Sequence, residues 1–353
     1  MKPKNPLRIT LLFALTSLMA CAQEMKISPE MLQTWLKQYP DADTNKDGVL
    51  TETEARVYYA RMLAAAPSVA PAPTRSNVRY GSDARNVFDF WQAKSDKPTP
   101  VVIYIYGGGF VSGDKSVVRT MKLVPQCLNA GVSVVAINYR YLAPGVTLPD
   151  VLHDCARAVQ FVRSQAAELK IDKTRIASCG NSAGAGTSMW LAFHPDMADP
   201  TNVDPVLRES TRLCAAVSWD GQFTYDFPLW GKYLGEDNRQ NFGGIYNSPG
   251  IYGLKSKDEL DSPAGRKLRA ECDFYDMISA DDPPIYIGCG LKSTAVSDVN
   301  QYLHNPRHSQ LLYERCRERG VVVVAKIPIL GILPAAGDPP YGEALMLKYL
   351  TAK

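Results

Sequence analysis

The sequence predicts a protein of the α/β class, with a doubly wound, mostly parallel sheet and a small N-terminal helix–loop–helix. From Val78 onward, short apolar runs typical of buried strands alternate with stretches of helical periodicity. Two of these runs lead into glycine-rich turns, at the strand ends where sites form in such sheets. Residues 27–66 instead contain two short helical patterns around an acidic loop.

Length and composition fit one large domain with an appendage. The chain has 353 residues, of which 46% are hydrophobic and 21% are charged, values typical of a soluble globular protein with a sizeable core. The net charge is only +3, and Lys and Arg are scattered along the chain. We therefore expect no nucleic-acid partner, because proteins that bind nucleic acids carry clustered basic residues.

Residues 1–22 predict a secretory signal peptide rather than part of the fold. Basic residues precede an apolar run over 9–20 that is too short to span a membrane. Leu-Met-Ala before Cys21 resembles a bacterial lipoprotein signal, which implies membrane attachment through a lipidated Cys21. Ala20-Cys21-Ala22 also fits an ordinary signal peptidase site. Both patterns predict an exported protein, either a periplasmic or cell-envelope lipoprotein or a secreted protein.

The acidic loop at residues 43–54 matches the twelve-residue calcium loop of an EF-hand. Calcium prefers oxygen ligands, and Gly48 stands where the loop needs a sharp turn. The expected ligands are Asp43, Asn45, Asp47, Val49 through its carbonyl, Thr51 through a water, and Glu54. EF-hands usually pair and this one stands alone, so Ca²⁺ is expected to be structural. The alternative is an acidic loop that only begins a helix.

The large domain is expected over residues 78–353, after a stiff Pro/Ala linker over 67–77. Strands are predicted over 101–106, 132–138, 175–179, 213–219, 284–289 and 321–327, and a helix over 150–169. Strands that alternate with helices favour a parallel sheet covered on both faces. Residues 222–280 are rich in aromatics, Gly and Asp with little periodicity, which predicts an insertion that caps or lines a cleft.

A serine nucleophile is predicted at Ser182. Gly180 to Gly184 match Gly-x-Ser-x-Gly, directly after a predicted strand and before a helical run. A tight strand-to-helix turn exposes the serine hydroxyl, and the flanking glycines let neighbouring backbone pass. The Ala183 N–H then lies at a helix N-terminus, where it can face a developing oxyanion. The alternative is an ordinary glycine-rich turn.

The glycine run after the strand over 101–106 predicts the rest of an oxyanion hole. In Tyr106-Gly-Gly-Gly-Phe110, consecutive glycines allow backbone N–H groups to point into a site. We expect Gly107 and Gly108 to be the donors. The alternative is a loop that uses glycine only for close packing.

From about Val78 to its end, the chain resembles the hormone-sensitive-lipase and feruloyl-esterase-like branch of the α/β-hydrolases. The matching segments keep the family's order and spacing, and they are 106–110 with 113–116, 138–144, 152–163, 171–176 and 180–184. The resemblance implies an α/β-hydrolase fold, esters of small or sugar-linked acids as substrates, and no cofactor for the ester chemistry. Tyr106 stands where the family has the His of a His-Gly-Gly-Gly turn, but the expected donors are backbone groups.

A catalytic triad also needs a base beside the serine and a carboxylate that orients the base. In the fold that the resemblance implies, the acid follows the strand after the insertion, which predicts Asp298. The family's histidine lies after the last strand, but residues 328–343 contain no His. The resemblance makes His153 structural, and His194 is expected to lie too far from the serine.

His304 and His308 are therefore the candidate bases. Asn305 fits a helix N-cap and Pro306 the first helical residue. His304 would then lie in the loop and His308 in the first turn, both at the sheet edge where sites form. A helix N-terminus disfavours the imidazolium and keeps a neutral base available. His304 is the better single candidate, because a loop residue can be aimed more freely.

These features predict an exported serine-type carboxylic ester hydrolase that acts on small-molecule or carbohydrate esters and is linked to a calcium-binding helix pair. The alternative is a catalytically silent protein of the same fold, which lacks the usual triad histidine and binds a carbohydrate or a protein partner. A third interpretation is a calcium-dependent scaffold of the cell envelope. The position of the base separates the first two.

Overall fold

The computed structural model describes residues 32–33, 36–37, 39–65 and 68–352. The expected signal peptide over 1–22, including Cys21, and most of the first expected helix lie outside the described residues. Export and lipidation therefore stay predictions. Across the described residues, no helix combines the length and the apolar character that crossing a membrane requires.

Within the described residues, one sheet of eight strands forms the centre of the large domain, in the order β1-β2-β4-β3-β5-β6-β7-β8. Strands β3 to β8 run parallel to one another, whereas β1 and β2 pair antiparallel at one edge. The bounds are β1 Arg75–Arg79, β2 Val87–Trp91, β3 Thr99–Ile105, β4 Ser133–Ile137, β5 Ile171–Asn181, β6 Ala215–Trp219, β7 Ile285–Gly288 and β8 Val323–Lys326. The prediction of a mostly parallel sheet is confirmed.

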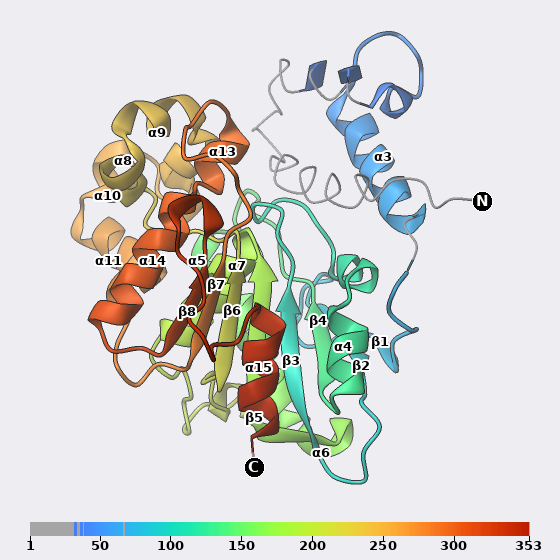
Figure 1. The fold of residues 1–353 in the computed structure, drawn as a ribbon. Helices are drawn as coiled ribbons and strands as arrows, with labels where there is room; N and C mark the ends of the chain where they lie inside the picture. The colour runs from blue at the N-terminus through green and yellow to red at the C-terminus, as the bar shows by residue number, and fades with distance from the viewer. Residues whose placement is uncertain (1–31, 34–35, 38, 66–67, 353) are drawn as a thin grey trace.

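Helices cover both faces of the sheet, and all seven residues of β3 are buried between them. The bounds are α4 Leu123–Asn129, α5 Leu148–Ser164, α6 Ala166–Leu169, α7 Ala183–Phe193, α14 Pro306–Glu318 and α15 Gly342–Thr351. α15 passes in front of the strands and contacts α4, while α5 and α7 lie behind them (Figure 1). The helix predicted over 150–169 is divided at Gln165 into α5 and α6.

The insertion over 222–280, here called the cap, folds into short helices at one end of the sheet (Figure 1). They are α8 Pro228–Leu234, α9 Glu236–Phe242, α10 Lys257–Leu260, α11 Pro263–Cys272 and α12 Phe274–Met277. α13 Val299–Leu303 comes from the loop after β7 and contacts α9. Helices this short complete only about one to three turns, so the sequence shows little periodicity there.

The segment predicted as a linker over 67–77 packs against the large domain. The Ala70 N–H donates to the Arg119 carbonyl at 3.0 Å, and the Trp91 indole N–H donates to the Pro71 carbonyl at 2.8 Å. β1 also begins inside this segment. The described part of the predicted linker is therefore docked on the large domain, because its backbone groups find partners there.

Candidate active site

Ser182 lies in a strained turn between β5 and α7. Its φ of 52° and ψ of −124° are unfavourable for a non-glycine residue, and strain of this kind costs about 1–3 kcal/mol. A Cβ at Gly180 or Gly184 would come within 2.5 Å or 2.0 Å of the Ile105 carbonyl oxygen, so neither position has room for a side chain. The Ser182 N–H is fixed by a 3.0 Å hydrogen bond to the Trp219 carbonyl. The turn thus holds the serine at the end of β5.

His304 approaches the serine from the loop after β7. Its Nε2 lies 2.8 Å from Ser182 Oγ, and the imidazole is buried. Its Nδ1 lies 3.1 Å from the Asn300 backbone oxygen and 3.0 Å from the Asn300 side-chain oxygen. A carbonyl oxygen only accepts hydrogen bonds, so Nδ1 carries the proton and Nε2 accepts from the serine hydroxyl. Of the two candidate histidines, His304 is the one that the structure brings to Ser182.

The surroundings of His304 favour a neutral imidazole. Burial lowers its pKa, and the charge of Asp220, the Asn300 carbonyl and the charge of Asp298 oppose this without reversing it. Asp220 directly follows β6 with a φ of 51°, and its Oδ1 accepts the Gly290 N–H at 2.7 Å. A neutral imidazole is available to take a proton from the serine hydroxyl.

Asp298 does not hydrogen-bond the imidazole, contrary to the prediction. Its side chain is exposed, and its Oδ1 accepts the Gln301 N–H at 2.8 Å as the N-cap of α13. Carboxylates are favoured at this position, because the first N–H groups of a helix lack partners. Asn300 instead of Asp298 contacts His304 Nδ1, because Asn300 lies one helical turn before His304. Asp298 acts on the imidazole through its charge instead.

His308 packs under the cap and does not reach the serine. Its Nε2 lies 3.1 Å from the Tyr302 carbonyl oxygen, and its ring centre lies 4.6 Å from that of Trp230. Burial lowers the pKa of His308 to about 3, so the ring is neutral at ordinary pH. The predicted start of α14 is confirmed, with the Asn305 side chain accepting the Arg307 N–H at 3.0 Å. Its first turn faces the core, which removes His308 as a base.

Backbone N–H groups of the glycine run lie beside the serine. A Cβ at Gly107 would come within 3.0 Å of Ser182 Cβ, so Gly107 lies directly against the nucleophile. Gly108 and Gly109 have φ values of 113° and 61°, which glycine adopts without strain. Hydrogen bonds among the described residues leave the N–H groups of Gly108, Gly109 and Ala183 without an acceptor. Gly109, which lines the pocket described below, is thus a further candidate donor beside those predicted at Gly107 and Gly108.

Tyr106, which stands where the resemblance places a His, supports this turn by packing. Its ring stacks on Tyr139 with centres 4.5 Å apart, and Arg85 donates to its hydroxyl at 2.7 Å. The Tyr139 hydroxyl donates to the Tyr106 carbonyl at 3.0 Å. The aromatic pair and the guanidinium therefore fix the backbone just before the glycines.

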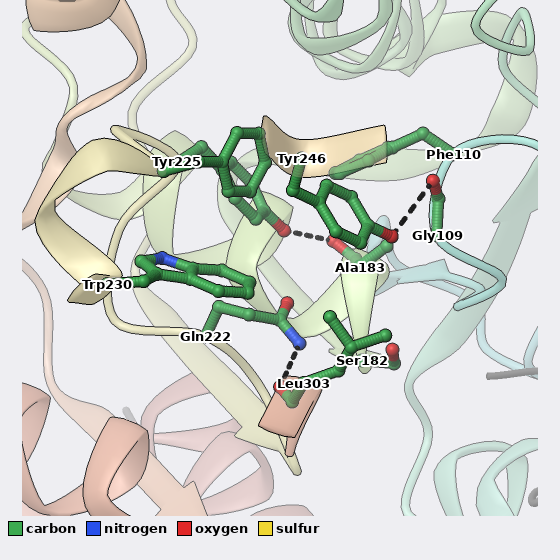
Figure 2. A pocket seen from close by; sticks show the side chains of 10 residues that line it. Gly109, Phe110, Ser182, Ala183, Gln222, Tyr225, Trp230, Tyr246 and Leu303 are labelled. Atoms are coloured by element: carbon green, nitrogen blue, oxygen red, sulfur yellow. Dashed lines mark hydrogen bonds between the residues drawn. The ribbon is translucent and has the colours of Figure 1, made fainter. Parts of the chain in front are cut away.

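An aromatic pocket opens beside Ser182 (Figure 2). The non-atom space at the pocket, open solvent included, is about 280 Å³. The pocket is lined by Gly109, Phe110, Ser182, Ala183, Gln222, Tyr225, Phe227, Trp230, Tyr246 and Leu303. The Tyr225 hydroxyl donates to the Ala183 carbonyl at 2.6 Å, and the Tyr246 hydroxyl to the Gly109 carbonyl at 3.4 Å. The cap is therefore bonded to both walls that carry the oxyanion donors.

The acidic loop at 43–54 follows the 3₁₀ turn Pro40–Ala42 and ends in the first turn of α3 Glu52–Ala65. Asp43 accepts the Gly48 N–H at 2.9 Å, and Glu54 accepts the Thr51 hydroxyl at 2.7 Å. The hydrogen bonds from Thr51, followed by those from the start of the loop, lower the pKa of Glu54 to about 2. In the described residues, no three His, Cys, Asp or Glu side chains converge on one point as a metal site.

The donor chemistry of this loop fits Ca²⁺ all the same. The side chains of Asp43, Asp47 and Glu54 offer oxygen atoms, and the φ of 83° at Gly48 makes the sharp turn that an EF-hand loop needs. The Glu54 carboxylate already connects both ends of the loop, from Thr44 to Thr51. Binding would replace these internal hydrogen bonds with metal contacts.

Comparison with solved structures shows the architecture. The chain matches a truncated form of a carbohydrate esterase from gut microbiota with a TM-score of 0.54 and 20% sequence identity, over 74% of this chain and 90% of that chain. The chain has the α/β-hydrolase fold. An acetyl ester-xyloside bifunctional hydrolase from Caldicellulosiruptor lactoaceticus matches with a TM-score of 0.50 and 23% identity, over 74% of this chain and 86% of that chain.

Sequence comparisons agree with this α/β-hydrolase architecture. Residues 89–224 match the family model described as BD-FAE. The sequence is 34% identical over 226 residues to a protein of Mycobacterium tuberculosis (strain ATCC 25618 / H37Rv) named "Probable carboxylic ester hydrolase LipM". That match covers 62% of this chain and 48% of the relative, so the chain spans about half the length of this curated relative.

Besides Gly109, the sequence did not predict Asn300, Asp220 or Gln222 as residues of the site. Asn300 precedes His304 at the i, i+4 spacing that puts two side chains on one face of a helix, but a five-residue helix gives too weak a pattern to recognise. Asp220 directly follows a predicted strand at the edge where sites form, and this was a usable signal. Gln222 is a single polar residue at the start of the cap, which carries no such signal.

Proposed function

We propose that the protein is a serine-type carboxylic ester hydrolase. The observation that supports this most strongly is the 2.8 Å separation of Ser182 Oγ and His304 Nε2. A serine without an activating base is a weak nucleophile, and a base must lie within about 2.6–3.2 Å of the proton's donor atom. The strained turn, the free N–H groups and the adjoining pocket supply the other parts that acyl transfer needs.

In the proposed reaction, Ser182 Oγ attacks the ester carbonyl carbon while His304 Nε2 takes the hydroxyl proton. The negative charge that develops on the carbonyl oxygen is held by N–H groups of the glycine run and by Ala183 at the start of α7. The imidazolium is stabilised by Asn300 at Nδ1 and by the charge of Asp220. His304 then gives the proton to the leaving alcohol, and a water activated by the same Nε2 hydrolyses the acyl-serine.

The proposed substrates are small or carbohydrate-linked esters. The pocket beside Ser182 is walled by aromatic rings, which favours a short acyl group or a small alcohol over a long one. Two solved structures of the same fold are named as a carbohydrate esterase and an acetyl ester-xyloside hydrolase. Short acyl groups on sugars are therefore the first substrates to test.

Two measurements test the proposal. A fluorophosphonate probe should label Ser182 in the wild type and not in Ser182→Ala, as seen by mass spectrometry of the labelled peptide. Hydrolysis of p-nitrophenyl acetate should require both Ser182 and His304. A wild type that neither reacts with the probe nor cleaves any short aryl ester or acetylated sugar would favour a silent protein of this fold.

We further propose that the loop at 43–54 binds one structural Ca²⁺ through the ligands predicted from the sequence. Its all-oxygen donor set and the turn at Gly48 support this. Ca²⁺ should raise the melting temperature and Glu54→Gln should abolish the rise, because a ligand stabilises the folded state that binds it. Calorimetric titration that gives the same trace for wild type and Glu54→Gln would contradict calcium binding.

Export is proposed on the composition of residues 1–22 alone. Mass spectrometry of the mature N-terminus separates the two routes. A lipid-modified Cys21 as first residue supports membrane attachment, and an unmodified start after Ala22 supports free secretion. A mature protein that keeps Met1 would contradict both.

A further inference from the structure

Gln222 is a buried polar side chain in the aromatic wall of the pocket, with 5% of its surface exposed. Its Nε2 donates to the Leu303 carbonyl at 2.9 Å. A carbonyl can only accept, so this hydrogen bond decides which end of the amide is nitrogen. The amide oxygen Oε1 therefore points away from Leu303, and Figure 2 shows it on the side of Tyr225 and Ala183.

No donor among the described residues reaches Gln222 Oε1. The polar hydrogens of two aromatic neighbours are used elsewhere. The Tyr225 hydroxyl donates to the Ala183 carbonyl at 2.6 Å, and the Trp230 indole donates to the Thr224 carbonyl at 3.0 Å. A buried acceptor that loses water without gaining a partner costs about 1–3 kcal/mol. A ligand that displaces water from this pocket must therefore bring a donor or lose affinity.

We propose that Gln222 Oε1 selects esters that carry a hydroxyl group, which donates to it beside the reacting serine. The inference rests on the proposed ester hydrolysis and names its substrate class. The hydroxyl can belong to the acyl chain or to the alcohol half, as in a sugar, because both offer the same O–H donor. Discrimination of this kind is stronger than that of an apolar wall, since an ester without the hydroxyl leaves a buried oxygen unpaired.

Gln222 also touches the base side of the site. Leu303, whose carbonyl it binds, directly precedes His304. Substitution of Gln222 thus has two expected effects. Loss of the hydrogen bond to Leu303 disturbs His304 and slows every substrate alike, whereas loss of Oε1 slows only substrates with the hydroxyl. The ratio of kcat/KM between an ester with the hydroxyl and its matched ester without it separates these two effects.

The kinetic test uses two matched pairs of esters on wild type and Gln222→Met. p-Nitrophenyl 3-hydroxybutyrate and p-nitrophenyl butyrate differ by an acyl hydroxyl, and 2-hydroxyethyl acetate and ethyl acetate differ by an alcohol hydroxyl. The wild type should favour the hydroxylated member of one pair by about 10-fold or more in kcat/KM, and Gln222→Met should bring that ratio to about 1. Wild-type ratios near 1 for both pairs, or a ratio that Gln222→Met leaves unchanged, would overturn the inference.

Two further variants separate recognition from folding and positioning. Phe227→Leu alters a wall residue without polar side-chain atoms, so it should change rates but keep the wild-type ratio. Gln222→Glu keeps an acceptor toward the pocket but loses the amide donor to Leu303. It should lower both rates and keep a ratio above 1, and a ratio of about 1 in this variant counts against Oε1 as the selecting atom.

A binding test separates failure of the inference from failure of the proposed function. Calorimetry with Ser182→Ala compares methyl 3-hydroxybutyrate and 2-hydroxyethyl acetate with methyl butyrate and ethyl acetate. A hydroxyl preference that disappears in Ser182→Ala/Gln222→Met supports the selection even if the wild type hydrolyses nothing, and only ester hydrolysis would then be wrong. Equal affinities and equal rates for each pair overturn the selection and leave ester hydrolysis intact.

Discussion

The two halves of the candidate site are built by different means. On the nucleophile half, backbone conformation decides the geometry, because the φ of Ser182 and the glycines around it leave one way to connect β5 to α7. On the other half, which carries the candidate base, side chains decide the geometry. His304 lies at the end of the five-residue helix α13, and Asn300 holds its imidazole. Ser182 is therefore held by the sheet, whereas His304 reaches it from a separate loop at the same edge.

The largest effect is expected from removing the base. His304→Ala should lower kcat about 10⁴-fold or more, nearly as much as Ser182→Ala, because nucleophile and base act as a unit. Steady-state kinetics on p-nitrophenyl acetate measures this. His308→Phe is the matched control and should stay within a few-fold of wild type while its melting temperature falls. Full activity in His304→Ala would mean that the base half has been misassigned.

Replacing the neutral partner of the imidazole should have the next largest effect. Asn300→Leu removes the side-chain acceptor at Nδ1 and should lower kcat about 10- to 100-fold with little change in KM, by analogy with other groups that orient a catalytic base. Asn300→Asp adds a negative charge beside the ring, which raises its pKa. The acidic limb of the pH profile of kcat/KM should therefore move to higher pH.

Asp298→Asn is the control for this pair. It keeps the helix cap and removes a charge that only acts at longer range, so kcat should stay within a few-fold of wild type. If Asp298→Asn lowers kcat more than Asn300→Leu does, the carboxylate predicted from the sequence is the true partner of the base.

Asp220→Asn should shift the pKa of His304 in the opposite direction from Asn300→Asp, with a smaller loss of rate. The charge of Asp220 raises the pKa of His304 against the effect of burial. Removing it should lower that pKa further, so the acidic limb of kcat/KM should move to lower pH while kcat falls a few-fold. A pH profile that superimposes on the wild type would exclude Asp220 from the electrostatics of the base.

The smallest effect is expected from Glu271→Gln, which weakens the contacts between the cap and helices α5 and α7. Glu271 of α11 lies 3.1 Å from His153 on α5 and 3.3 Å from His194 at the end of α7. Burial lowers the pKa of His194, but the bonds to Glu271 and to the Pro195 carbonyl outweigh it and the net shift is upward. The bonds from His153 and then His194 lower the pKa of Glu271 to about 2.

The sign of the pH dependence follows from these two shifts. Stability from His194 is complete below its usual pKa of 6.5 and is lost as the pH rises through the raised value. Stability from Glu271 is complete above its usual 4.5 and is lost as the pH falls toward 2. Glu271→Gln should therefore lower the free energy of unfolding most between these limits, by about 1 kcal/mol for such partly exposed groups. Urea unfolding at pH 5.5 and pH 9 measures this, and an equal loss at both would contradict it.

The sequence predicted the turn at Ser182 well because that turn is local. Ser182 and its flanking glycines lie within five residues, and their motif describes the backbone turn itself. The base half depends on contacts across 122 residues of chain between Ser182 and His304, and on a helix too short to show a pattern. The sequence therefore identified His304 as a candidate by position but assigned Asp298 the role in which the structure has Asn300.

The same reasoning explains why the sequence did not predict the edge strand β1. β3 is buried along its whole length and gives an apolar run that predicts a strand, whereas β1 is mostly exposed and gives none. An exposed antiparallel edge strand is recognised by its partner rather than by its own residues. In the cap, aromatic side chains from separate short helices meet around Trp230, and no pattern within one helix describes that packing.

The position of His304 before β8 has a consequence for the loop after β8. This loop runs from Ile327 to Tyr341, is pinned by a bridge between Ile327 and Ile332, and exposes 61% of Leu333. In the proposed mechanism the base comes from the loop before β8, so neither the attack on the ester nor the proton transfer involves the loop after β8. Exposed loop tips are also the sites that best tolerate new sequence. A peptide or a whole binding domain inserted near Leu333 would thus leave every group of the proposed reaction in place, which makes this loop a natural point for adding new sequence to the protein.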